Sequence, residues 1–470
     1  MPNDKIFPSP EAAVADVPDG ATIAVAGFGL TQSFPSSLTV ALRAQGAKEL
    51  CIVANSLGEG PYRSMTLIEN HQVKRLIVSF SARASGDRSP AEQQIAAGDI
   101  EVELVPQGTL VERLRAAGAG IGAVFTRTGV GTVVAEGKEV RTIDGVDYVL
   151  EKALPVDYAL IRARRADRFG NLDFAGVGRN FMPSFAKGAQ IAIAEVDEIV
   201  EGALPPESID LPGIFVDRVV LQTADVKPRF WAARPGAGSD AAQEYNGKRG
   251  WTRGEMAKIT ADLIPEGSYV NLGVGMPTLV SNHIAGRDVT LHGENGVLGY
   301  GEAAAEEDYD PALYNAGGEY VRLRPGGSYF ESVTAFEMVR GGHVDAVVLG
   351  GFQVDAHANL ANWSQPAMVG GGIGGAMDLV AGGGTVMVMM THTAKNGAHK
   401  LVAECDYPLT GPACVDIVVT DLAVFRWNGE RFVVERVADG FSFDEIAELT
   451  DFPLVASPEF TAREGAFARD

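Results

Sequence analysis

The chain has 470 residues, 46% of them hydrophobic and 21% charged, which is the composition of a globular protein with two or three domains. Its 39 basic and 61 acidic residues leave a formal net charge of −22, which argues against a nucleic-acid or anionic-membrane partner. The first residues, MPNDKIFPSPEAAVADVPDG, lack an apolar core, and the apolar runs are too short to cross a membrane, so we expect a soluble, cytoplasmic protein.

The first half of the chain predicts alternating strands and helices. Strands are expected at ATIAVAG, LCIVAN, RLIVSF and IEVELVP, and helices at SSLTVALRAQG and GTLVERLRAAG. In the second half, a helix at WTRGEMAKITADLI leads into strands at SYVNLG, DVTLH and DAVVLGG. Continuous apolar strands that alternate with helices indicate mostly parallel sheets covered on both faces. We therefore expect an α/β fold whose ligands bind at the carboxyl ends of the strands.

The two halves echo each other in sequence. The segment at 156–161, followed by D-x-x-x-N at 167–171, recurs 188 positions later at 344–349 and 355–359. Likewise, PDG at 18–20 is matched by PEG at 265–267. The sequence thus predicts two duplicated domains, 1–222 and 250–470, joined by a linker at 223–249 in which Phe230 and Trp231 pack against a domain.

A strand followed by a glycine-flanked carboxylate is the first candidate site. In VTLHGENG, the glycines at 293 and 296 remove side-chain bulk around Glu294 and present its carboxylate to an open space. The same letters fit a hairpin tip, in which Asn-Gly forms the turn and the glutamate is solvated. The pattern alone leaves both interpretations open.

Two more glycine-rich segments end predicted strands. In NLGVGMP, the Asn271 amide and the free N–H groups of the loop can bind a carbonyl oxygen or a carboxylate, and a helix follows near Pro277. A dinucleotide fingerprint is weakly supported because its third glycine is missing. The segment GGGIGGAMD at 370–378 allows close backbone approach to a ligand but lacks the Lys-Ser/Thr of a phosphate loop.

Other chemistry finds little support in the sequence. Asn55 and Gln107 end strands in the first half, where such residues are more often turn formers than ligands. None of the seven histidines has metal-ligand spacing, and the three cysteines contain no C-x-x-C pair, so neither a metal site nor a disulfide framework is predicted. G-x-S-x-G and H-E-x-x-H motifs are absent from the sequence.

Together, these motifs resemble the class I coenzyme A transferase family over nearly the whole chain. The family's Ser-Glu-Asn-Gly turn is similar to GENG at 293–296, and its G-x-G-x-P loop is present at 273–277. Its RGGHVD, GGAMDL and PLTG segments stand at 340–345, 374–379 and 408–411. The order of the two halves is similar to that of the succinyl-CoA:3-oxoacid and 3-oxoadipate CoA-transferases, and related enzymes carry the halves as separate subunits.

The resemblance implies a fold and a chemistry. The fold would be two duplicated CoA-transferase-type domains, each an open, mostly parallel β-sheet flanked by helices. CoA would pass between carboxylic acids by a ping-pong mechanism through a thioester on Glu294. The implied oxyanion donors and substrate contacts are Asn271, Asn55, Gln107 and Gly375, and the implied CoA or acyl loops contain Gly273, Gly275, Gly374 and Ala376.

The resemblance also implies the partners. Coenzyme A is a substrate, no cofactor or metal is held permanently, and acyl-CoA and small carboxylic acids are the ligands. We expect a homodimer or larger homo-oligomer. The expected donor is succinyl-CoA and the expected acceptor a 3-oxoacid such as acetoacetate. A 3-oxoadipate or other dicarboxylate transferase is the alternative, followed by an acyl-CoA hydrolase. A non-catalytic CoA-binding regulator is a further alternative, and the intact GENG turn argues against that one.

The sequence departs from the family pattern near the implied acyl pocket. Gly318 stands where the family usually has lysine, Arg83 falls in a replaced Gly-Glu-Asn stretch, and Arg127 replaces a proline. The glycine loop at 31–35 lacks its usual second glycine. A lost lysine removes a carboxylate partner, which Arg83 or Arg127 could supply unless both are solvated.

Overall fold

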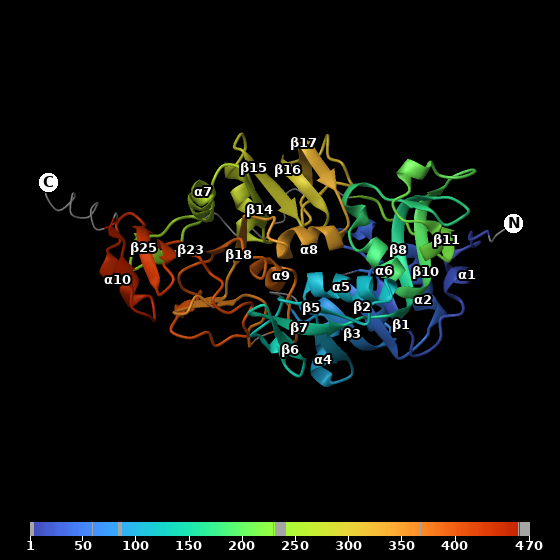
Figure 1. Ribbon diagram of the computed structural model, residues 1–470, viewed down its shortest axis with the longest axis horizontal. Helices are drawn as coiled ribbons and strands as arrows, with labels where there is room; N and C mark the ends of the chain where they lie inside the picture. The colour runs from blue at the N-terminus through green and yellow to red at the C-terminus, as the bar shows by residue number, and fades with distance from the viewer. Residues whose placement is uncertain are drawn as a thin grey trace.

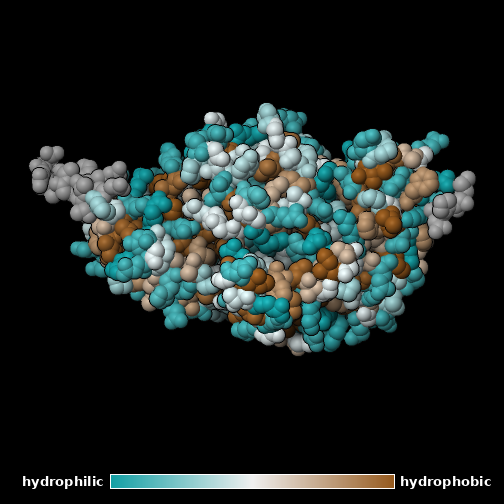
Figure 2. All heavy atoms as spheres, viewed as in Figure 1, coloured by the Kyte–Doolittle hydropathy of each residue, from teal (hydrophilic) through white to brown (hydrophobic). Residues whose placement is uncertain are grey.

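The computed structural model describes residues 4–58, 60–82, 87–228, 230, 241–366, 368–458 and 460. Within these residues, two large sheets lie side by side along the long axis of the molecule (Figure 1). Polar and apolar side chains are interspersed over the face shown in Figure 2, as on most globular proteins. No helix of the described part is long and apolar enough to span a bilayer.

The first large sheet has eight strands in the order β11-β10-β8-β1-β2-β3-β4, with β9 paired to β8. Its strands are β1 (Thr22–Val25), β2 (Leu50–Ser56), β3 (Val73–Phe80), β4 (Glu101–Leu104), β8 (Val156–Ala166), β9 (Leu172–Asp173), β10 (Ala189–Ile199) and β11 (Arg218–Leu221). The helices of this half are α1 (Pro10–Val14), α2 (Ser36–Gln45), α3 (Met65–Glu69), α4 (Pro90–Ala97), α5 (Gln107–Gly118) and α6 (Met182–Lys187). A small sheet beside them contains β5 (Ala123–Thr126), β6 (Val140–Ile143) and β7 (Val146–Lys152).

The second large sheet has ten strands in the order β17-β16-β15-β14-β18-β21-β23-β24-β25-β26. They are β14 (Ser268–Leu272), β15 (Val289–Gly293), β16 (Val297–Ala303), β17 (Val321–Tyr329), β18 (Ala346–Gly350), β21 (Thr385–Met389), β23 (Ile417–Val419), β24 (Ala423–Trp427), β25 (Phe432–Val437) and β26 (Val455–Ala456). Its helices are α7 (Arg253–Leu263), α8 (Ser332–Arg340), α9 (Ala376–Val380), α10 (Phe443–Glu448) and the 3-10 helix η6 (Met276–His283). A small sheet contains β19 (Gln353–Asp355), β20 (Leu360–Ala361) and β22 (Leu401–Val402).

The two sheets share a parallel core, which confirms the predicted α/β fold with two duplicated units. The order β11-β10-β8-β1-β2 in the first sheet matches β23-β21-β18-β14-β15 in the second, and every neighbouring pair within each set is parallel. The sequence echoes occupy equivalent places. The N–H of Thr22 donates to Asp157 Oδ2 and that of Tyr269 to Asp345 Oδ2, both at 2.8 Å.

The D-x-x-x-N echoes form the same turn in both halves. Asn171 Nδ2 donates to Asp167 Oδ2, and Asn359 Nδ2 donates to Asp355 Oδ2, each at 2.9 Å. In both turns the other oxygen of the aspartate accepts the backbone N–H of the asparagine. The aspartate and asparagine thus recur because the turn uses the carboxylate to satisfy its own backbone.

The halves are packed together by α8, whose Val333 and Phe336 lie in the hydrophobic core of the first half. They share that core with residues of α5 and α6, including Leu110 and Phe185. Figure 1 shows α8 at the centre of the molecule, beside α5. This packing brings strand ends of the two sheets to one place, where the site lies.

The predicted linker contains an unexpected hairpin. Within 241–249, β12 (Glu244–Tyr245) pairs with β13 (Lys248–Arg249), and Tyr245 Oη donates to Asp421 Oδ2 at 2.9 Å. Phe230 packs against the second half, with its ring centroid 5.3 Å from that of Tyr309, as predicted. Trp231 lies outside the described residues.

Candidate active site

Glu294 lies on a tight turn between two antiparallel strands. Gly293, the last residue of β15, pairs with Val297, the first of β16, and the Gly296 N–H donates to Gly293 O at 2.9 Å. The hairpin interpretation of the sequence is therefore right for the backbone. The part of that interpretation in which the glutamate is solvated is wrong, because Glu294 is only 6% exposed.

Asn271 holds the Glu294 carboxylate from the neighbouring strand. Because β14 and β15 are parallel with Asn271 opposite His292, the Asn271 side chain reaches the turn that follows β15. Its Nδ2 lies 2.9 Å from Glu294 Oε2 and 3.1 Å from His292 Nδ1. Burial lowers the pKa of His292 to about 4, so this imidazole is neutral and adds no cation beside the glutamate.

The electrostatics of Glu294 follow from this enclosure. Burial raises the pKa of the Glu294 carboxyl, and the Asn271 hydrogen bond opposes that shift by stabilising the charged form. Ser332 Oγ donates to the backbone carbonyl of Glu294 at 3.2 Å and fixes the turn on α8. The result is a held carboxylate that has lost most of its hydration, which favours nucleophilic attack.

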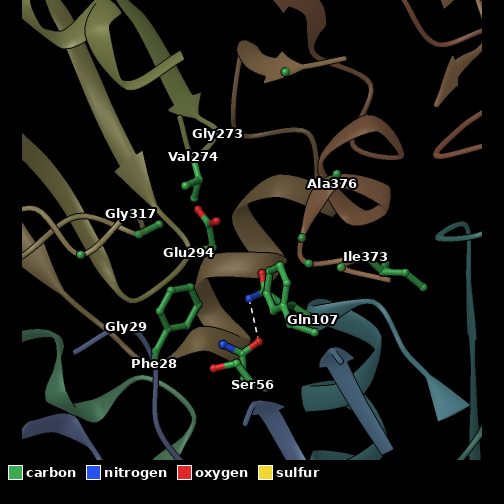
Figure 3. Close-up of a pocket in the computed structure, with 18 of the residues that line it drawn as sticks. Phe28, Gly29, Ser56, Gln107, Gly273, Val274, Glu294, Gly317, Ile373 and Ala376 are labelled. Atoms are coloured by element: carbon green, nitrogen blue, oxygen red, sulfur yellow. Dashed lines mark hydrogen bonds between the residues drawn. The ribbon is translucent and has the colours of Figure 1, made fainter. Parts of the chain in front are cut away.

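Asn55 and Gln107 form the facing wall, from the first half. Asn55 belongs to β2 and Gln107 begins α5, and Gln107 Nε2 donates to Asn55 Oδ1 at 2.7 Å, the dashed line in Figure 3. This bond turns the Asn55 amide so that its Nδ2 has no acceptor among the described residues. An amide N–H that is held in place and unpaired at a cavity wall is available to donate to a negatively charged oxygen of a ligand.

The glycine-rich segment at 370–375 closes the site by pairing with the end of β3. Gly372 forms an antiparallel bridge with Phe80, and the Ser81 N–H donates to Gly371 O at 3.0 Å. Gly374 has φ +56, and a Cβ there would lie 2.7 Å from Phe80 Cζ, so glycine is required for this approach. The Gly374 carbonyl accepts the Gln107 N–H at 2.9 Å. The N–H of Gly375 donates to no described group.

These walls enclose a cavity of about 1330 Å³ at the junction of the two halves. Figure 3 shows Glu294 directed toward the loop of Gly273 and Val274, with Gln107 and Phe28 on the other wall. Val274 is 58% exposed, which leaves an apolar side chain ready to cover a ligand. Of the candidate residues named from the sequence, those that line the cavity are Glu294, Asn55, Gln107, Gly273, Gly374, Gly375 and Ala376. Asn271 lies buried beneath Glu294, and neither it nor Gly275 lines the cavity.

Of the two arginines named from the sequence, the structure describes only Arg127. Arg127 is exposed and does not line this cavity, and Arg83 lies outside the described residues. The structure places Arg63 there instead, at 6% exposure. Its Nη1 donates to Gly29 O at 3.1 Å, and its Cζ lies 3.3 Å from the centre of the Phe34 ring. Sequence reasoning missed Arg63 because it sits in the irregular segment GPYRS, where no periodicity shows which side chains turn inward.

The backbone and the neighbours of Gly318 disfavour a side chain where the family usually has lysine. Gly318 has φ +82, and a Cβ there would lie 3.3 Å from Leu30 Cδ2. Leu30 directly precedes the segment 31–35, which lacks the second glycine of the family pattern. The two departures are thus neighbours in space, and a side chain at 318 would be both strained and crowded.

The family profile described as "Coenzyme A transferase" matches residues 7–222 and 254–449. The chain belongs to the coenzyme A transferase family. Human succinyl-CoA:3-ketoacid coenzyme A transferase 2, mitochondrial, is 38% identical over 477 residues, which cover 97% of this chain and 90% of that protein. One of the subunits of the 3-oxoadipate CoA-transferase of Pseudomonas putida is 47% identical over 210 residues, which cover 43% of this chain and 96% of that relative.

A solved structure supports the same fold for this CoA-transferase. The crystal structure of an acyl-CoA transferase from Escherichia coli O157:H7, in a thioester complex with CoA, superposes with a TM-score of 0.78 at 23% identity. The match covers 97% of this chain and 94% of that one. The two chains therefore share one fold over almost their whole lengths.

Proposed function

We propose that this CoA-transferase moves CoA from succinyl-CoA to a 3-oxoacid such as acetoacetate, through a glutamyl-CoA thioester on Glu294. The observation that carries the mechanism is the Glu294 carboxylate itself, buried, held by Asn271 and open to a large cavity. The acid pair is supported by the name of the human relative, which the chain matches over nearly its whole length.

The proposed transfer needs neither a metal ion nor ATP, because each bond that forms replaces one that breaks. An oxygen of the Glu294 carboxylate attacks the thioester carbonyl carbon, and the C–S bond breaks to give an acyl-glutamyl anhydride and CoA thiolate. The thiolate then attacks the Glu294 carbonyl carbon, which forms the glutamyl thioester and releases the first acid. The acceptor carboxylate repeats these two steps in reverse and leaves as the new acyl-CoA.

Each addition places negative charge on a carbonyl oxygen, and the cavity walls, together with the Asn271 amide buried beneath Glu294, supply donors for it. We assign this role to the amides of Asn271 and Asn55 and to the Gly375 N–H, with Gln107 orienting Asn55. Loss of one such donor typically costs about 10²–10³ in kcat. The loops of Gly273, Gly275, Gly374 and Ala376 bring backbone close to the CoA or acyl group.

We assign the recognition of the far carboxylate of a succinyl group to Arg63. It is a buried guanidinium on the cavity wall, and the contacts with Gly29 O and Phe34 hold its planar fork in one orientation. A guanidinium is a charge-assisted hydrogen-bond donor for a carboxylate. Arg83 and Arg127 remain alternative candidates for this recognition.

The second candidate function is transfer to 3-oxoadipate. It is favoured by the 47% identity to part of a 3-oxoadipate CoA-transferase, and both acids present a 3-oxoacyl group to the same glutamate. Hydrolysis of acyl-CoA requires water at the glutamyl thioester, and the enclosure of Glu294 opposes this outcome.

Intact-mass analysis tests the mechanism. Incubation with succinyl-CoA and no acceptor should add CoA, less water, to the wild-type chain and nothing to Glu294→Ala. Absence of the adduct, or the same adduct in the variant, would overturn it. A hydrolase would release free CoA without any acceptor. Turnover of succinyl-CoA with acetoacetate, 3-oxoadipate, acetate and mesaconate then ranks the acceptors.

We also propose the domain limits 1–222 and 250–470, a homodimeric or larger assembly, and a cytoplasmic location. The location differs from that in the names of the human and rodent relatives, which are mitochondrial. Light scattering of the purified protein and fractionation of the source cells test the assembly and the location.

A further inference from the structure

Besides Arg63, the cavity is lined by the cationic residues Lys227, Arg253 and Lys400, of which Lys400 lies at the end nearest β21. Lys400 precedes β22, and its backbone N–H donates to His392 O at 3.3 Å. It lines the same cavity as Glu294, together with Met390 and Thr391, which follow β21. The catalytic function proposed for the Glu294 site does not use this lysine.

The order of the strands gives the distance between Glu294 and the end of β21, beside which the Lys400 backbone lies. The strands run in the order β15-β14-β18-β21, and Glu294 follows the first of them while Met390 and Thr391 follow the last. Neighbouring strands are roughly 4.8 Å apart, so three spacings separate the two places by about 14 Å. At about 1.2 Å per bond, the far carboxylate of a four- to six-carbon acid bound to Glu294 extends only about 7 Å, which is about half of the way to the end of β21.

The Lys400 ammonium is unpaired within the part of the chain that the structure describes. It makes no hydrogen bond or ion pair with any residue that the structure describes. Asp421 is the nearby carboxylate, but its two oxygens accept Tyr245 Oη at 2.9 Å and the His392 N–H at 2.7 Å. Burial lowers the pKa of Lys400 to about 8, and the charge of the nearby Asp421 carboxylate opposes this shift.

The surroundings favour an anion at this end. Arg253, at the start of α7, lines the cavity as well, and the neighbouring Trp251 N–H donates to Asp421 O at 2.6 Å, which brings the start of α7 to the same corner as Lys400. Burial lowers the pKa of His392 to about 3, so it is neutral. His399 pairs with Asp451 at 2.6 Å and stays on the outer side.

We propose that Lys400 binds the phosphate that ends the pantetheine arm of CoA, while the thiol of the same molecule lies at Glu294. Thirteen bonds join the thiol sulfur to that phosphorus, and at about 1.2 Å per bond the extended arm spans ~16 Å, which matches the three strand spacings. The inference rests on the proposed thioester at Glu294, because that thioester fixes the position of the sulfur. A phosphate held at one end then orients the reacting end.

The test uses donors of different length with the full-length enzyme. Steady-state kinetics are measured with succinyl-CoA, succinyl-4′-phosphopantetheine and succinyl-pantetheine, for wild type, Lys400→Met and Lys400→Arg. Lys400→Met should lower kcat/KM about 30-fold for the two donors that carry the phosphate. It should change kcat/KM for succinyl-pantetheine less than two-fold, and Lys400→Arg should restore part of the loss. Lys395→Met, an exposed lysine of the same segment, is the matched control and should match wild type with every donor.

Three outcomes would overturn the proposal. Equal losses with and without the phosphate would mean that Lys400 supports the fold, and no loss with any donor would mean that it meets only solvent. Acetyl-CoA is measured as a fourth donor, and a loss with succinyl-CoA but not with acetyl-CoA would assign Lys400 to recognition of the acid. If Lys400→Met does not fold, Lys400→Arg is compared with wild type instead. The deciding measurement is then the ratio of kcat/KM for succinyl-4′-phosphopantetheine to kcat/KM for succinyl-pantetheine in each protein. The covalent adduct in the wild type is an independent readout, so failure of the proposed chemistry is seen separately.

Discussion

At Glu294, a carboxylate is taken out of water and receives one amide hydrogen bond, from Asn271 at 2.9 Å, and no ion pair from the described residues. A carboxylate of this kind is a stronger nucleophile than a hydrated one, because less water must be removed before it attacks. The same burial penalises its charge and raises its pKa. Reactivity and instability at this residue therefore have one cause.

The pH dependence of Glu294 follows from that shift. Its folded-state pKa lies above the unfolded value, so its contribution to stability is fully present below the unfolded pKa and is lost as pH rises through the folded pKa. Glu294→Gln should therefore gain unfolding free energy over wild type as pH rises, with little difference near pH 4. Urea unfolding between pH 4 and pH 8 measures the difference. A constant gain across this range would contradict the assignment.

The activity should follow the opposite direction, because attack requires the ionised carboxylate. In wild type, kcat/KM for succinyl-CoA should rise with pH through the raised pKa of Glu294 and then level off. Glu294→Asp keeps the charge but shortens the side chain by one methylene. It should lose at least about 10²-fold in kcat through misplacement. A pH–rate profile with no acidic limb would contradict this prediction.

The role proposed for Arg63 is tested by comparing a donor whose acyl group carries a second carboxylate with one whose acyl group does not. Arg63→Met should lower kcat/KM for succinyl-CoA by about 10- to 100-fold and leave that for acetyl-CoA nearly unchanged, since only the first donor offers a second carboxylate. Arg127→Met is the competing variant at an exposed site. If Arg127→Met changes the succinyl-to-acetyl ratio and Arg63→Met does not, the carboxylate is recognised at Arg127 instead.

Among the elements, the hairpin of β15 and β16 does most to place Glu294, the proposed nucleophile. Gly296 has φ +107, and a Cβ there would lie 2.1 Å from the backbone oxygen of Phe330. Asn295 Nδ2 donates to Tyr314 O at 2.7 Å and ties the turn to a second loop. The glycine after Glu-Asn is thus required by the close approach of the chain that follows β17, and not only by the turn itself.

Gly296→Ala should therefore lower the unfolding free energy by more than about 2 kcal/mol and reduce formation of the CoA adduct, because strain and a backbone clash act together. Gly286→Ala is the matched control, with φ +79 and open space around its Cβ. It should cost about 1 kcal/mol and leave the adduct intact. Urea unfolding and intact mass measure both. Equal effects of the two variants would show that backbone strain alone matters.

Over the whole molecule, a buried charge cluster joins the two halves beside the active site. Asp378 of α9 accepts the Gly108 N–H at 2.8 Å, Thr128 Oγ1 at 3.0 Å and Arg340 Nη1 at 3.3 Å. Arg340 Nη2 also lies 2.7 Å from Glu112 Oε1 of α5. Since Gly108 follows Gln107 and α9 follows Gly375, this cluster sets the facing walls of the cavity relative to each other.

Arg340→Met should leave Asp378 buried without its cation and cost about 3–5 kcal/mol of unfolding free energy. It should also lower kcat more than it raises KM, since Gln107 and Gly375 would lose their alignment. Arg322→Met removes an arginine that is half exposed and paired at the surface with Asp308, and should cost about 0–1 kcal/mol. A cost for Arg340→Met no greater than that for Arg322→Met would contradict this role.

The sequence by itself determined the features that depend on near neighbours along the chain. The strands β1, β2, β3, β4, β14, β15 and β18, the helices α2, α5 and α7, and the glycine-flanked turn at Glu294 were predicted, because periodicity and turn chemistry act over a few residues. The repetition of D-x-x-x-N in both halves was also seen in the sequence. The motifs were also sufficient to indicate the coenzyme A transferase family. The hairpin at 244–249 was missed because its strands are only two residues long.

Only the tertiary structure decided which groups are taken out of water and which walls face each other. It buried Glu294, left Arg127 on the surface, and brought Arg63 and Lys400 into the cavity. It also joined Gly372 to Phe80, nearly three hundred positions apart in the chain. Burial, and pairing between residues far apart in the chain, depend on how α8 packs the two halves together. A local sequence pattern cannot predict that packing.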